Sequence, residues 1–181
     1  SIPGRYPMAE LITAAGFTAS YLAYEDDGVA WVLLACAFVS VLAIVTLTDL
    51  ERRLIPNAVT APAAAIGIVL VLAADPDELP EHLIAAAAAG GALLLVALAY
   101  PRGMGMGDVK LAAVMGIYLG RAVAPALLIG FLLGALYGAA LIARHGAAAR
   151  KRAVPFGPFL ALGGLAGLFA GDELADWYVD E

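Results

Sequence analysis

Two aspartates lie at the ends of long apolar segments, where a charged side chain is costly. Asp108 follows the glycine-rich run from Gly103 to Gly107, and Asp49 closes an apolar run that begins near residue 29. A carboxylate costs roughly 2.5–3.5 kcal/mol at the centre of a membrane helix and less towards its end. Glycine permits unusual dihedral angles and the close approach of another backbone. An acid at a membrane boundary, preceded by backbone without side chains, therefore indicates a binding or reaction site.

Two carboxylates close together could perform acid–base chemistry. Because like charges a few ångströms apart cannot both ionise cheaply, one member keeps its proton while the other acts as a base. Such a pair could activate a water molecule and protonate a carbonyl or a leaving amine, which is peptide hydrolysis without a metal or a covalent intermediate. The titration belongs to the pair and not to either Asp alone. Gly103, Gly105 and Gly107 could leave room for an extended substrate strand.

The same residues fit two other interpretations. Asp49 could pair with Arg53 one helical turn further on. Asp108 could pair with Lys110 or Arg102, so that both acids are ordinary interfacial charges. Acids within membrane helices also mark proton relays and ion sites in transporters. Residue chemistry alone therefore leaves a hydrolase, a small proton- or cation-coupled transporter and a pair of structural charges open.

The composition is that of a membrane protein. Of the 181 residues, 63% are hydrophobic and 14% are charged, whereas a typical soluble domain is about 45–50% apolar and about 25% charged. The apolar residues occur in blocks close to the length of about 17–25 residues that crosses a bilayer. With two His and one Cys, the chain has neither a Cys-rich zinc site nor a disulfide framework. We expect no metal and no cofactor.

We therefore predict an all-α bundle of about seven transmembrane helices that forms one domain over residues 1–181. Polar turns, prolines and glycines separate the apolar blocks. The fifth helix is short for a span, so we expect a partly sunken start at Asp108. In the sixth, Gly130, Gly134 and Gly138 recur at four-residue spacing and indicate a face for close helix packing. The expected helices are about 8–24, 29–49, 57–74, 81–100, 108–120, 122–143 and 156–171.

Charge separates to the two sides of this bundle. With the N-terminus in the cytoplasm, nine of the ten Lys and Arg residues fall on the cytoplasmic side and only Arg121 on the other. Twelve of the sixteen acids fall on the outer side. Asp49 and Asp108 then both lie at cytoplasmic helix ends, at similar depth. We interpret the basic run 144–152 as an anchor against anionic lipid.

Two histidines and one glutamate are weaker candidates. His82 falls in an outer acidic turn and His145 in a basic turn, and we interpret both as solvated. Glu10 lies near the start of the first helix, where it could help to shape the site. The sequence favours the simpler interpretation, in which Glu10 is an ordinary interfacial partner of Arg5.

Four short motifs follow one another along the chain. Gly105-Met-Gly-Asp-Val-Lys110 resembles the Gly-x-Gly-Asp-x-Lys motif of type IV prepilin peptidases, which are membrane aspartyl proteases. Thr48-Asp49-Leu50, followed by Ile55-Pro56-Asn57, resembles the first-aspartate motif of that family. Arg5-Tyr6-Pro7 with Glu10 resembles the segment that follows the cytoplasmic domain of bacterial members. The run from Val154 to Gly163 resembles their C-terminal signature, so the similarity covers nearly the whole chain.

The resemblance implies that Asp49 and Asp108 are the catalytic pair. It implies cleavage of the basic leader from prepilins and pseudopilins after a Gly, at the cytoplasmic face of the bacterial inner membrane. The apolar N-terminus of the mature substrate would stay in the lipid bilayer as a helix, in a type IV pilus or type II secretion system. No nucleic-acid partner is expected. A transporter and an inactive scaffold are the alternatives. The candidates for substrate binding are Glu10, Gly105, Gly107, Lys110, Pro155, Phe156 and Gly157.

The cysteine content departs from the family pattern. Full-length bacterial members begin with a further membrane helix and a cytoplasmic domain with paired Cys-x-x-Cys motifs, linked to N-methylation of the new pilin terminus. This chain has a single cysteine, Cys36, which we interpret as a packing residue. We therefore assign no methyltransferase activity, and no dependence on S-adenosylmethionine, to these 181 residues.

Overall fold

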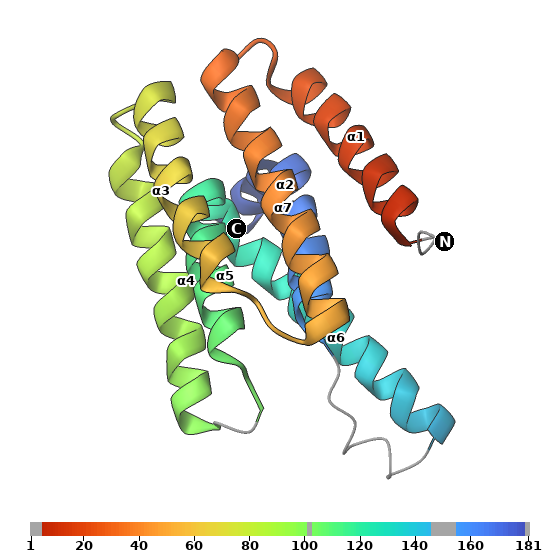
Figure 1. The fold of residues 1–181 in the computed structure, drawn as a ribbon. Coiled ribbons are helices and arrows are strands. Elements are labelled where there is room, and N and C mark those ends of the chain that lie inside the picture. The colour runs from red at the N-terminus through yellow and green to blue at the C-terminus, as the bar shows by residue number, and fades with distance from the viewer. Residues whose placement is uncertain (1–4, 101–102, 146–154, 180–181) are drawn as a thin grey trace.

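The computed structural model describes residues 5–100, 103–145 and 155–179, and within these the side chains of residues 9–171. The described residues form α-helices joined by short connections and contain no strand, which confirms the all-α prediction (Figure 1). Most of the basic run 144–152, the side chain of Arg5 and residue Arg102 lie outside what is described. The helices are α1 (Arg5–Tyr24), α2 (Val29–Arg52), α3 (Asn57–Ala74), α4 (Leu79–Ala99), α5 (Met106–Leu119), the short 3₁₀ helix η1 (Gly120–Ala122), α6 (Val123–His145) and α7 (Gly157–Val179).

The helix ends nearest the two acids differ from the predicted ends. α2 continues to Arg52, because the chain turns only at Arg53, whose φ of 51° is left-handed and whose N–H donates to the Asp49 carbonyl at 2.9 Å. α5 begins at Met106 rather than at Asp108, so this acid is the third residue of the helix. α7 runs on to Val179, beyond the expected end near residue 171.

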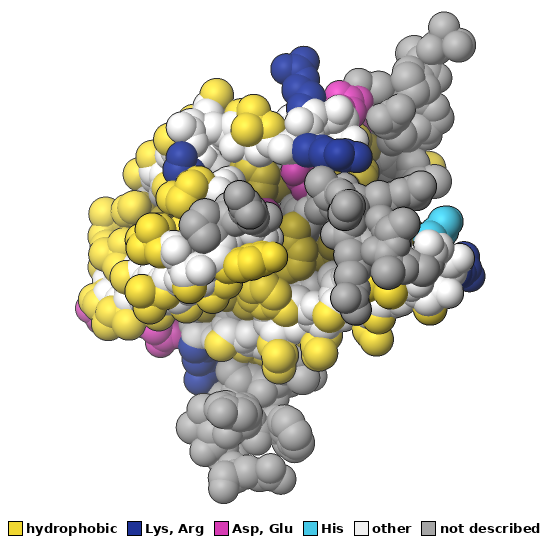
Figure 2. Space-filling view, turned by 90° about the horizontal axis from the view of Figure 1, so that it is seen from below, with side chains coloured by type: hydrophobic (Ala, Val, Ile, Leu, Met, Phe, Trp, Pro, Cys, Tyr) yellow, Lys and Arg dark blue, Asp and Glu magenta, His cyan; other side chains and the backbone are white. Residues whose placement is uncertain are grey.

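Successive helices run in alternating directions, so the described connections fall at two ends of the bundle (Figure 1). The end of α2, the start of α3 and the start of α5 meet at the lower end. Arg52, Lys110 and Arg144 belong to this end, and Figure 2 shows Lys and Arg side chains on the face seen from below. The acidic turns at 25–27 and 75–78 lie at the other end. The described helices thus agree with the predicted separation of charge.

The core lies between α2, α5 and α7. Its largest fully buried side chains include Phe38 and Leu42 from α2, Leu111 and Met115 from α5, and Leu160 from α7. Small residues bring neighbouring helices together at the margins of this core. α6 packs on α7 where Gly130 faces the backbone of Phe159 and Leu160, as the glycine spacing predicted, whereas Gly138 has no atom within 4 Å of a built Cβ.

Several segments have the length and apolarity of membrane spans. Four meet both criteria: Val29–Arg52, Asn57–Ala74, Leu79–Ala99 and Met106–His145, with a shorter apolar stretch at Gly157–Gly171. Large apolar side chains such as Leu95 and Leu136 are about two-thirds exposed, as expected for a surface that faces lipid. The chain is a multi-pass membrane protein. The number of crossings stays a prediction, since α1 is not among these segments.

Candidate active site

Asp49 is a buried acid held by a distant part of the chain. It lies in the last turn of α2 and is 6% exposed. Its Oδ2 accepts a 2.8 Å hydrogen bond from the backbone N–H of Gly157, the first residue of α7. The start of a helix carries a partial positive charge, and its first N–H groups have no partner within the helix. This bond therefore gives one of these N–H groups a partner and fixes the position of Oδ2.

Asp108 is held by its own helix. Its backbone N–H donates to the Gly105 carbonyl at 3.1 Å, and its Oδ2 accepts the Gly105 N–H at 3.3 Å. The second bond is one half of a capping box, in which an acid three residues into the helix satisfies a backbone donor ahead of it; Gly105 has no side chain to supply the other half. The helix begins where it does because of this cap. The glycine loop and Asp108 thus form one local unit.

One cavity of about 390 Å³ joins the two predicted motifs. Its walls come from the last turn of α2 with Asp49, from the connection 53–57, and from residues 105–108 and Lys110 at the start of α5. Pro56 is extended ahead of α3, with φ at −73°, which its ring fixes, and ψ at 140°. The fold therefore brings together Asp49 and Asp108, which are 59 positions apart in the sequence, at the basic end of the bundle.

The remaining cavity residues tie α5 to the connection ahead of α3. A Cβ built on Gly107 would lie 3.0 Å from the Ile55 Cβ, so glycine allows a close approach there. Lys110 Nζ donates to Asn57 Oδ1 at 2.7 Å. Among the described side chains, Lys110 forms no ion pair with Asp108.

The predicted substrate-binding residues divide into two groups. Gly105, Gly107 and Lys110 line the cavity, whereas Glu10 is exposed on α1 and is not part of its lining. Gly157 contacts Asp49 directly. Pro155 and Phe156 are half-buried just ahead of α7, outside the lining. The roles of all of these residues stay predictions.

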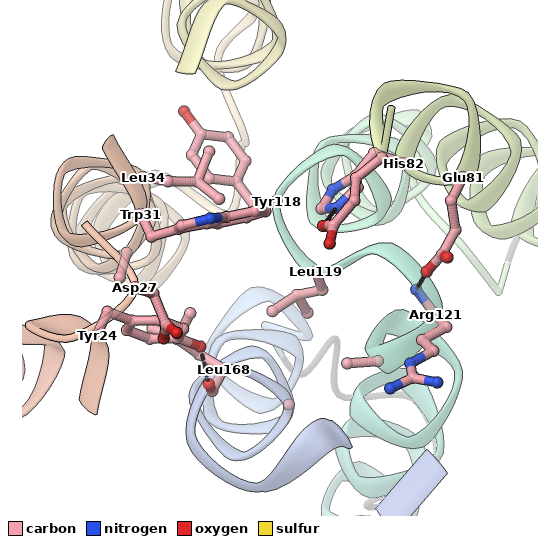
Figure 3. A pocket seen from close by; sticks show the side chains of 14 residues that line it. Tyr24, Asp27, Trp31, Leu34, Glu81, His82, Tyr118, Leu119, Arg121 and Leu168 are labelled. Carbon is pink, nitrogen blue, oxygen red and sulfur yellow. Dashed lines mark hydrogen bonds and ion pairs between the residues drawn. The ribbon is translucent and has the colours of Figure 1, made fainter. Parts of the chain in front are cut away.

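A second cavity, of about 480 Å³, lies at the opposite end of the bundle, and His82 is one of the residues that line it (Figure 3). The position of His82 differs from the prediction. His82 is 5% exposed, not solvated, and its Nδ1 donates to the Ile117 carbonyl at 2.7 Å. The prediction is wrong because the first turn of α4 packs on α5, so that His82 meets the Ile117 carbonyl and not solvent. The spacing of Glu78 and His82, whose side chains lie 3.7 Å apart, is a helical signal that could have shown this. His145 is exposed, as predicted.

Sequence reasoning missed the partners of the site residues. It linked Gly157 with substrate rather than with Asp49, and it left the partner of Lys110 open. Pro155-Phe156-Gly157-Pro158 was the available signal, since prolines are common at a helix start and the first N–H groups of a helix, which have no partner within it, can bind an acid.

Fold and site together define a polytopic membrane protein with two acids in one cavity at a shared end of its helices. The model of the type IV leader peptidase family matches residues 36–139, which include both acids. The chain therefore belongs to the type IV leader peptidase family.

Full-length relatives agree with this assignment. The chain is 35% identical to a prepilin leader peptidase/N-methyltransferase of Bacillus subtilis over 176 residues, which cover 96% of this chain and 69% of the relative. It is 34% identical to one of Aeromonas salmonicida, with 99% and 62% covered, and 28% identical to one of Pseudomonas aeruginosa, with 99% and 63% covered. The chain thus spans between three-fifths and seven-tenths of these relatives. No solved structure gives a significant match.

Proposed function

We propose that this chain is a membrane aspartyl endopeptidase that removes the basic leader from type IV prepilins or pseudopilins, cutting after a Gly. The observation that carries the proposal is the cavity shared by Asp49 and Asp108, two acids on different helices. Membership of the type IV leader peptidase family, and relatives named prepilin leader peptidase, support this substrate class. No described feature favours the transporter alternative.

The proposed reaction uses the two carboxyl groups in opposite protonation states. One carboxylate takes a proton from water as the water oxygen attacks the scissile carbonyl carbon, and the other carboxylic acid gives its proton to the departing amine. Water is consumed, the C–N bond breaks, and a new carboxyl and a new amino terminus result. Gly105 and Gly107 line the cavity beside Asp108, and an extended substrate backbone would lie in this cavity.

We further propose that the site faces the cytoplasm from the bacterial inner membrane. Lys and Arg accumulate on cytoplasmic loops, and the cavity lies at the basic end of the bundle. A leader rich in basic residues would then meet the site on the side where it is synthesised, while its apolar segment stays in the bilayer. On this proposal residues 1–181 form one peptidase domain, and no methyltransferase activity is assigned to it.

Cleavage of a prepilin in liposomes tests the proposal. The parent chain, Asp49→Asn and Asp108→Asn are compared, since Asn keeps the size of Asp and can still accept the backbone hydrogen bonds. We expect each variant to lose about 10²–10⁴-fold in kcat, the usual contribution of an acid–base group. Asp77→Asn, an exposed acid at the far end of the bundle, is the matched control and should retain the parent rate.

Two results would contradict the proposal. An Asn variant at either site that is folded and cuts at the parent rate would show that this acid is only a structural charge. A parent chain that is folded in liposomes yet cuts no prepilin or pseudopilin after its leader Gly would remove the assigned activity. Gel filtration and far-UV circular dichroism establish that each variant is folded.

A further inference from the structure

The buried bond between Gly157 and Asp49 links the final quarter of the chain to the candidate active site. Both residues are buried, and the bond from the Gly157 N–H to Oδ2 is 2.8 Å long. Gly157 lies outside residues 36–139, the part of the chain that matches the family model. The bond occupies one oxygen of the carboxylate and leaves Oδ1 for chemistry.

Only glycine allows α7 to start this close to the acid. A Cβ built on residue 157 would lie 2.9 Å from Asp49 Oδ2 and 3.1 Å from both Cγ and Cβ of the same side chain. The first of these distances is shorter than a carbon–oxygen contact normally reaches. Rotation of the carboxylate would relieve the contact with Oδ2, whereas the 3.1 Å contact with the Asp49 Cβ could be relieved only by a small shift between α2 and α7.

The start of α7 is itself fixed by α6. The carbonyl of Phe156 accepts the N–H groups of Phe159 and Leu160 at 3.0 and 3.2 Å, which begins the helix. The ring of Phe156 packs against Phe131 of α6, with 5.2 Å between ring centroids. It also covers Gly134, where a built Cβ would lie 2.7 Å from Phe156 Cε2. One face of α6 therefore sets where Gly157 presents its N–H.

We propose that the α6–α7 junction is a positioning device for Asp49. Gly157 orients the carboxylate through its backbone N–H, and Phe156, seated over Gly134, keeps Gly157 in place. Both act through Asp49 and not as substrate contacts. The glycine spacing of α6 thereby serves the reaction as well as helix packing. This inference rests on the proposed peptidase function, and its test has one part that needs no activity.

Prepilin cleavage kinetics form the first part of the test. For Gly157→Ala we expect kcat to fall about 10–100-fold, since a misplacement of about 1 Å at a reacting group can cost about 10²-fold. The KM should stay within about twofold, because no substrate contact changes. Gly134→Ala should lower kcat by a smaller factor, because its methyl displaces Phe156 and reaches Asp49 only through it. The matched control is Gly138→Ala, one turn further along α6 with nothing within 4 Å of the new Cβ, which should keep parent kinetics.

Thermal unfolding in detergent forms the second part. Gly157→Ala is measured in the parent and in an Asp49→Ala background, which removes the carboxyl group that the methyl would meet. We expect the apparent Tm to fall by roughly 2–6 °C in the parent and by a smaller amount in the Asp49→Ala background, where only the contact with the Cβ of residue 49 remains. Equal shifts in the two backgrounds would mean that residue 157 does not meet the carboxyl group of Asp49, and would overturn the inference.

The two parts separate failure of the inference from failure of the proposed function. If Asp49→Asn is inactive while Gly157→Ala cuts at the rate of Gly138→Ala, the inference is wrong and the proposed function stands. If the parent cuts no prepilin, the proposed function fails, and the thermal comparison still decides whether Gly157 holds Asp49.

Discussion

α4 and α5 approach so closely that only glycine fits at one point of their contact. A Cβ built on Gly116 of α5 would overlap the backbone N and Cα of Ala86 and would lie 2.6 Å from the carbonyl carbon of Ala85. These are backbone atoms, which cannot rotate away. Gly116→Ala must therefore push the two helices apart. Gly91 of α4 is the matched control, since a Cβ there has nothing within 4 Å.

The magnitude follows from these distances. Non-bonded carbon atoms prefer about 3.5–4.0 Å, so the methyl requires a local separation of roughly 1 Å. Such overpacking costs about 1–3 kcal/mol, and a backbone obstacle places this site near the upper limit. Replacing glycine with alanine in a helix recovers at most about 1 kcal/mol. We expect Gly116→Ala to lose about 2 kcal/mol and about 4–8 °C in apparent Tm, and Gly91→Ala to gain up to about 1 kcal/mol.

Thermal unfolding of both variants in one detergent, followed by circular dichroism, measures this difference. The opposite signs make the comparison independent of the detergent chosen. Because α5 carries Asp108 in its first turn, we also expect Gly116→Ala to cleave prepilin more slowly per folded molecule than Gly91→Ala. If Gly116→Ala unfolds at or above the midpoint of Gly91→Ala, the close approach of α4 and α5 is incorrect.

Substitutions at three further places in the structure test other features. Lys110→Met removes the donor to Asn57 and should lower kcat/KM about two- to tenfold, the value of one modest hydrogen bond. Asn57→Ala should lower kcat/KM by the same factor, and the double variant should lose no more than either single variant. Additive losses would refute the hydrogen bond between the two residues. His82→Leu leaves the Ile117 carbonyl without its donor and should lower the free energy of unfolding by about 1–3 kcal/mol. His145 is exposed, so His145→Leu should leave the free energy of unfolding unchanged. Equal effects of the two substitutions would contradict the burial of His82. Gly120→Ala places a Cβ on a residue with φ of 52° and should lower the free energy of unfolding by roughly 1–2 kcal/mol. Its kcat should not change, because residue 120 lies at the end of the bundle away from Asp49. An unchanged stability would refute the positive φ at this position.

The sequence was sufficient for the helices and for the two acids. Apolar blocks bounded by prolines and polar turns placed the seven α-helices of the described residues, because spans that lie in lipid are apolar and the turns between them are polar. Asp49 and Asp108 were identifiable as site residues because a charged side chain at the end of a membrane helix is costly and usually has a function. The charge of the turns gave the direction of each helix, and this direction put both acids at one end.

The sequence was insufficient for helix ends and for contacts between helices. Arg53 has a left-handed φ, which at the end of a helix usually belongs to Gly or Asn. The residue type at position 53 therefore did not predict the end of α2. Helices that are apolar on every side give no sign of which face meets which neighbour. For this reason His82 was assigned to solvent, and the bond from Gly157 to Asp49 went unseen. Both depend on packing between segments far apart in the chain.

The two acids are held by different pairs of helices, which has a consequence for the membrane in which the protein works. Asp49 is fixed where α2 meets α7, whereas Asp108 is fixed by the cap of α5, which lies on α4. Their separation then depends on how the two pairs stand relative to each other along the bilayer normal. Helices tilt to match the thickness of the hydrocarbon layer around them. Acyl-chain length should therefore change the rate of cleavage without touching a residue, with a maximum at the thickness that brings the two carboxyl groups level.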